Sequence, residues 1–65
     1  MGVIEIEQDG QKYSAEYVLE ENVITVLGHS GQESTHLGGR SEEAIARTLL
    51  RTLIRKGHIE PIATE

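Results

Sequence analysis

SEEAIARTLLRTLIRKG, residues 41–57, predicts a single amphipathic helix. Its apolar side chains recur at helical spacing and, at about 100° per residue, cover an arc of roughly 180°. They are Ile45, Ala46, Leu49, Leu50, Leu53 and Ile54. Ser41 is a suitable N-cap residue and Gly57 a suitable left-handed terminator, so we expect the helix to span about 42–56.

Three arginines, Arg47, Arg51 and Arg55, are spaced four residues apart and fall within about 80° on the opposite side of this helix, and Lys56 follows them. One interpretation is a stripe that binds an anion or an acidic partner, because arginine makes bidentate contacts with carboxylates and phosphates. The other is a solvated face in which Glu43 pairs with Arg47 one turn away. The second interpretation requires no ligand, and we favour it.

The segment before the helix begins with a predicted β-hairpin. Residues 2–8 alternate apolar and polar side chains, and Asp9-Gly10 is a strong signal for a two-residue turn into a strand at 12–20. This turn sets Glu7 opposite a lysine and gathers the apolar side chains on one face. That face carries Ile4, Ile6, Tyr13, Ala15 and Tyr17.

A second hairpin is expected near Glu21-Asn22, joining the second strand to one at 23–28. A two-residue loop sets Leu19 opposite Ile24 and continues the same apolar face. A three-residue loop with a bulge would instead turn inward the residues Val23, Thr25 and Leu27. Because this strand is apolar on both sides, the sequence leaves both registers open.

The expected fold class is α+β, an antiparallel meander sheet of three to four strands packed on one C-terminal amphipathic helix. Residues 33–37 are the candidate fourth strand. After the helix, Pro61 prevents further helix, so residues 58–65 are expected to form an extended tail that docks through Ile59 and Ile62. All 65 residues belong to one small domain in this interpretation.

The composition disfavours several classes of protein. There is no cysteine, which excludes disulfide bonds and thiolate metal sites and is compatible with a reducing compartment. No apolar run has the length of a membrane span and no secretory leader is evident, so we expect a soluble cytoplasmic protein with no membrane contact. Asp9, the only aspartate, lies in a turn, and no nucleophile–base motif stands out. We therefore expect no enzyme activity, no catalytic residue and no cofactor.

The formal net charge of −5 conceals a segregation of charge along the chain. Residues 1–39 hold seven acidic side chains against Lys12 alone, whereas residues 40–58 hold five lysines and arginines against two glutamates. Such polarity can steer a partner or be neutralised within a dimer. The acidity of the whole chain disfavours nucleic-acid binding, because lysine and arginine contacts with phosphate supply most of the non-specific affinity.

Two histidines, His29 and His36, are candidates for a metal or acid–base site. In the expected third hairpin they share the outer sheet face and lie diagonally across neighbouring strands, with Glu33 nearby. Two imidazoles and a carboxylate can hold zinc, but this spacing matches no established motif, so we predict no metal ligand. Turn chemistry is the simpler explanation of the glycines Gly28, Gly31, Gly38 and Gly39.

The outer sheet face is expected to carry a contiguous apolar group: Val3, Val18, Val23 and Leu27. The apolar arc of the helix is also wider than one small sheet easily covers. Both features predict self-association, most simply a twofold dimer, through Ala46 or Ile54 of the helix, the outer valines, or both.

We predict a small non-enzymatic interaction protein that forms a homodimer or binds a protein partner. The alternative is a nucleic-acid-binding or regulatory module using Arg47, Arg51, Arg55 and Lys56.

Overall fold

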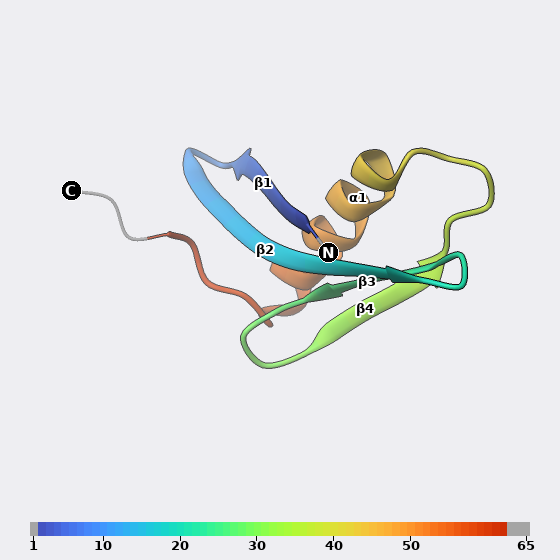
Figure 1. Ribbon diagram of the computed structural model, residues 1–65. Coiled ribbons are helices and arrows are strands. Elements are labelled where there is room, and N and C mark those ends of the chain that lie inside the picture. Colours follow the sequence, from blue (N-terminus) through green and yellow to red (C-terminus); the bar gives the residue numbers. More distant parts are fainter. Residues whose placement is uncertain (1, 63–65) are drawn as a thin grey trace.

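The computed structural model describes residues 2–62, which form a four-stranded antiparallel meander sheet with one helix packed across one face (Figure 1). The elements, in chain and sheet order, are β1 (Gly2–Gln8), β2 (Gln11–Glu20), β3 (Val23–Leu27) and β4 (Gln32–His36), followed by α1 (Glu42–Lys56). The α+β prediction is confirmed, with the fourth strand present. Residues 63–65 of the expected tail lie outside the described residues. Among residues 2–62, no helix has the length and apolar character needed to cross a membrane.

The first hairpin has the predicted two-residue turn. Asp9 and Gly10 both have positive φ, 55° and 78°, which matches the right-handed twist of the two strands that they join. The resulting register sets Glu7 opposite Lys12 and Ile4 opposite an alanine of β2. The two isoleucines of β1, Ile4 and Ile6, therefore face α1.

The second hairpin also has a two-residue turn, at Glu21 and Asn22, with φ of 50° and 65°. Leu19 pairs with Ile24, so the register that the sequence left open is the one without a bulge. A glutamate at positive φ is uncommon, but this register places the fully buried Ile24 on the inner face. The three outward side chains of β3 are consequently Val23, Thr25 and Leu27.

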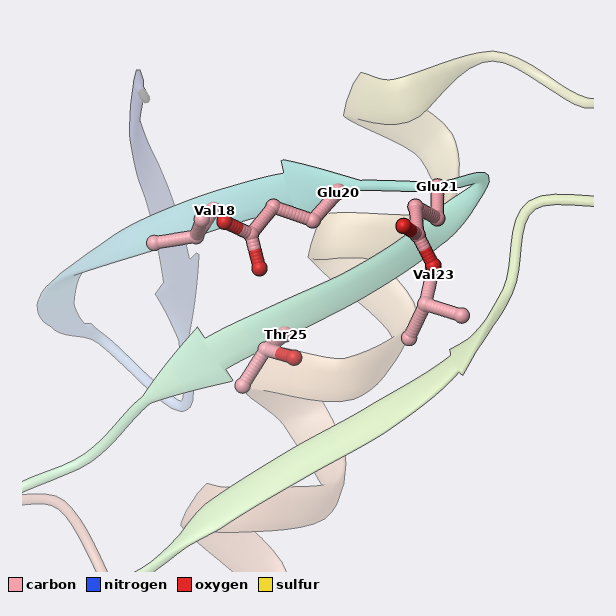
Figure 2. Close-up of a pocket in the computed structure, with 5 residues that line it drawn as sticks. All are labelled: Val18, Glu20, Glu21, Val23 and Thr25. Carbon is pink, nitrogen blue, oxygen red and sulfur yellow. The ribbon is translucent and has the colours of Figure 1, made fainter.

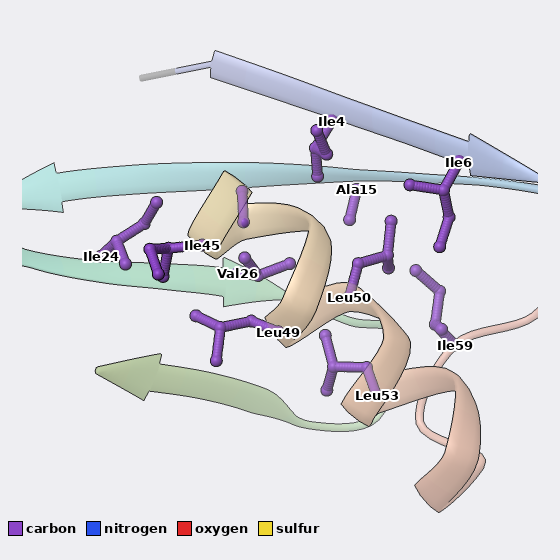
Figure 3. Packing of buried hydrophobic residues seen from close by; sticks show 11 residues of the cluster. Ile4, Ile6, Ala15, Ile24, Val26, Ile45, Leu49, Leu50, Leu53 and Ile59 are labelled. Atoms are coloured by element: carbon purple, nitrogen blue, oxygen red, sulfur yellow. The ribbon is translucent and has the colours of Figure 1, made fainter. Parts of the chain in front are cut away.

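The core lies between the sheet and α1, and Figure 3 shows its side chains meeting there. The buried side chains are Ile4, Ile6, Ala15, Ile24, Val26, Ile45, Ala46, Leu49, Leu50, Leu53 and Ile59. The expectation that the helical arc is too wide for one chain to cover is wrong. α1 contacts all four strands, and Ile59 of the tail covers more of the helix, so Ala46 is fully buried and Ile54 half-buried.

Capping groups fix both ends of α1. The Ser41 hydroxyl oxygen accepts a hydrogen bond from the Ala44 backbone N–H at 3.0 Å, as expected of an N-cap residue. At the other end Gly57 has φ of 78° and donates its N–H to the carbonyl oxygen of Ile54. The chain then turns back along the sheet, where the Ile62 N–H donates to the Lys12 carbonyl oxygen at 2.7 Å.

Candidate functional site

The sheet face opposite α1 is the candidate functional surface, because no element among residues 2–62 covers it (Figure 1). Two of its apolar side chains are prominently exposed: Val3 is 66% exposed and Leu27 36%. Val18 and Val23 lie beside them and are half-buried. The apolar group predicted for the outer face is therefore present, and we call the outward side chains of the four strands the outer face.

Two of the shallow hollows among the described residues lie on the outer face and are lined by its valines. The larger, of about 450 Å³, is shown in Figure 2, where the lining side chains of β2 and β3 project on the side away from α1. It is lined by Val18, Glu20, Glu21, Val23 and Thr25. The second, of about 380 Å³, is lined by Val3, Ser14, Ala15, Glu16, Leu27, Gly28 and His29. Both combine small apolar side chains with glutamates at their margins, which suits contact with another polypeptide better than enclosure of a small substrate.

The outer face is acidic. The strand register directs four exposed glutamates to it against one lysine. These residues are Glu5, Glu7, Glu16, Glu20 and Lys12. None of them is among the side chains that form ion pairs within residues 2–62. The face therefore presents uncompensated negative charge around its valines.

The arginines predicted as a binding stripe lie on the helix side that points away from the sheet. Arg47 Nη2 lies 3.3 Å from Glu43 Oε2, which is the pairing expected of a solvated face. Arg51 and Arg55 are exposed and form no ion pair within residues 2–62. Lys56 does not join the stripe, because its Nζ reaches 2.8 Å from an oxygen of a β4 glutamate.

The histidine arrangement predicted for the outer face is wrong. β3 ends at Leu27, so His29 lies in the loop after the strand, while His36 lies at the far end of β4, opposite Val23. His29 Nδ1 instead accepts a hydrogen bond from the Glu60 backbone N–H at 3.2 Å. Within residues 2–62, no group of three acidic, histidine or cysteine side chains is placed to hold a metal ion.

Sequence reasoning missed the role of the loop Gly28-His29-Ser30-Gly31. The His58 carbonyl oxygen accepts hydrogen bonds from the N–H groups of His29 (2.7 Å) and Ser30 (3.0 Å), and the Ser30 hydroxyl lies 3.2 Å from His58 Nδ1. A Cβ on Gly28 would stand 2.8 Å from the His58 carbonyl oxygen. The two glycines of this loop were the only sequence signal for the contact with His58. Glycine is required there because the backbone of the tail approaches too closely to leave room for a Cβ, and not because of turn conformation alone.

The Ser30–His58 pair resembles a nucleophile with its base, but its surroundings give it a structural role. The loop N–H groups that could stabilise an oxyanion already donate to His58, and within residues 2–62 no carboxylate hydrogen-bonds to its ring. The pair holds the segment after α1 against the loop after β3.

Comparison of the chain with protein-family models, with curated proteins and with solved structures finds no match.

Proposed function

We propose that the protein is a small non-enzymatic interaction protein that associates with copies of itself through the outer face of its sheet. The observation that carries this proposal is the exposure of Val3 and Leu27 beside the half-buried Val18 and Val23. An antiparallel sheet with one solvated face ordinarily places polar side chains there. On β3, by contrast, two of the three outward side chains, Val23 and Leu27, are apolar and available for contact with a partner.

The self-association expected from the sequence remains part of this proposal, and of the two contact surfaces expected there we keep only the outer face. Ala46 is fully buried within one chain and is not available to a partner. Ile54 packs against the core of its own chain and presents only part of its surface. The outer face is then the larger apolar surface available.

We propose the cytoplasm as the compartment, since a cysteine-free chain suits a reducing environment.

A dilution series followed by backbone amide NMR tests the proposal. The amide shifts of Val3, Val18, Val23 and Leu27 should move together as the protein concentration rises. Replacing Val23 and Leu27 with threonine keeps residues suited to strands but removes apolar surface, and should weaken association. The matched control is Ile62→Thr, because Ile62 is 40% exposed but lies on the tail. A monomer at every concentration, or shifts confined to α1, would contradict the proposal.

A second candidate function is a nucleic-acid-binding or regulatory module that uses the helix arginines. The observation favouring it is that Arg51 and Arg55 are exposed and unpaired within residues 2–62. Arg47 forms an ion pair with Glu43, and Lys56 forms one with Glu33. Fewer cationic side chains are therefore available to bind phosphate than the sequence suggested. We rank this function second because few phosphate contacts give little affinity.

A further inference from the structure

The two opposite sides of the molecule carry opposite charge. At about 100° per residue, the arginine stripe lies roughly 180° around α1 from the buried side chains that face the sheet. Arg51 and Arg55 therefore project from one side of the molecule, while Glu16 and Glu20 project from the other. The protein is an electrostatic dipole whose two ends are complementary surfaces.

This distribution disfavours the simplest dimer. A twofold contact between two outer faces sets the same surface against itself, so glutamates such as Glu5, Glu16 and Glu20 of one copy would meet those of the other. Like charges brought together across an interface oppose association. The copy that docks on the outer face must therefore present a different surface.

We propose that copies of this chain associate head to tail, with the exposed side of α1 of one copy seated on the outer face of the next. This inference rests on the proposed function and names the surface that the outer face recognises. Arg51 and Arg55 of one copy would pair with Glu16 and Glu20 of the next, with Val18 between the two glutamates.

The spacing of the charges on the two surfaces is compatible with this contact. Glu16 and Glu20 are four residues apart on β2, about 13 Å at about 3.3 Å per residue. Arg51 and Arg55 are one helical turn apart, about 6 Å at 1.5 Å per residue, and their long, flexible side chains can spread along the helix to cover the remaining difference. One helix face can therefore reach both glutamates at once.

The helix also offers small apolar groups beside its arginines. Ala44 is exposed on the arginine side of α1. Thr48 donates its hydroxyl to the Ala44 carbonyl oxygen at 3.1 Å, and Thr52 donates to the Thr48 carbonyl oxygen at 3.2 Å. Because these hydroxyls are turned to the helix backbone, the methyl groups remain for contact with Val18 and the hollow around it.

Two charge-reversed variants of the full chain test this arrangement by sedimentation velocity. Glu16→Lys with Glu20→Lys disables the outer face and leaves the helix face intact. Arg51→Glu with Arg55→Glu disables the helix face and leaves the outer face intact. Circular dichroism confirms that each variant folds, and Glu42→Lys with Glu60→Lys is the charge-matched control for the first, since both glutamates are exposed off the outer face.

The expected result is that wild type and control associate and that each charge-reversed variant alone is monomeric. An equimolar mixture of the two variants should associate again beyond two copies, because the original arginine–glutamate contact alternates with one between the new lysines and the new glutamates. Added salt should weaken the wild-type association, roughly tenfold between about 0.05 and 0.5 M, because exposed charge pairs are screened. If only the outer-face variant loses association, the outer face docks on itself, which overturns the head-to-tail arrangement but not the proposed function. A monomeric wild type, or two variants that associate as wild type does, overturns both.

Discussion

Lys56 Nζ lies 2.8 Å from Glu33 Oε2, joining the last turn of α1 to the inner side of β4. The glutamate side chain is only 23% exposed, whereas the lysine side chain is 53% exposed. This pair ties the short polar strand β4 to the helix at a place where the strand contributes no aliphatic side chain. It also removes Lys56 from the set of cations available to an outside ligand.

Replacing Lys56 with glutamine should lower the free energy of unfolding by about 1 kcal/mol or less, the usual contribution of a partly exposed ion pair. Urea denaturation followed by circular dichroism measures this difference. Arg55→Gln is the matched control, because Arg55 has no ion-pair partner within residues 2–62. Equal effects of the two substitutions would show that the pair with Glu33 contributes nothing specific.

Leu50→Ala should lower the free energy of unfolding by about 2–5 kcal/mol, because Leu50 is fully buried between α1 and the sheet and its loss leaves a cavity. Such a loss is large for a chain of this size, so partial unfolding at ambient temperature is expected. Leu27→Ala, on the outer face, should change stability by far less. Thermal melts at low protein concentration compare the two variants, and similar melting temperatures would contradict the assigned core.

Gly28→Ala should loosen the contact between the loop after β3 and the segment after α1, because the new Cβ stands 2.8 Å from both the Gly31 and the His58 carbonyl oxygens. We expect a destabilisation of about 1–3 kcal/mol, the range for overpacking. Hydrogen exchange of the His29 and Ser30 amides, which donate to His58, reports the contact directly. Ser30→Ala removes only the side-chain hydrogen bond and should leave these amides protected.

Replacing Arg47, Arg51 and Arg55 together with glutamine separates the two candidate functions. If the stripe binds nucleic acid, the substitution should abolish binding, and log K of the wild type should fall by roughly 0.9 per phosphate contact for each unit of log salt on duplex DNA. We expect instead an intact fold, weaker self-association and no measurable wild-type affinity. Tight wild-type binding to random duplex at about 0.15 M salt would reverse our ranking.

Local patterns made most of the fold predictable from the sequence. Asp9-Gly10 fixed the register of the first hairpin, and Ser41 and Gly57 marked the ends of α1. Alternation along the strands also predicts the outward valines, of which only Val23 depends on the length of the second turn. The register there could not be decided beforehand because β3 is apolar on both sides, and only packing against α1 distinguishes its faces.

Contacts between segments far apart in the sequence were the part that could not be predicted. The approach of His58 to Gly28 joins residues thirty positions apart, and no local pattern specifies it. The cover that Ile59 provides for α1 is of the same kind: Ile59 follows the helix, and no local pattern specifies that it packs against it. Proximity in sequence groups Lys56 with the arginine stripe, whereas the fold brings it to Glu33.

The order of the elements determines how this chain can fold while a ribosome is still making it. All four strands precede α1, yet the inner face of the sheet is covered by α1 and Ile59. At about 5–20 residues per second, the sheet spends roughly one to a few seconds with its isoleucines uncovered before the helix emerges. A nascent chain that stalls before Glu42 therefore displays an apolar sheet, which is the kind of surface that chaperones bind and that promotes aggregation.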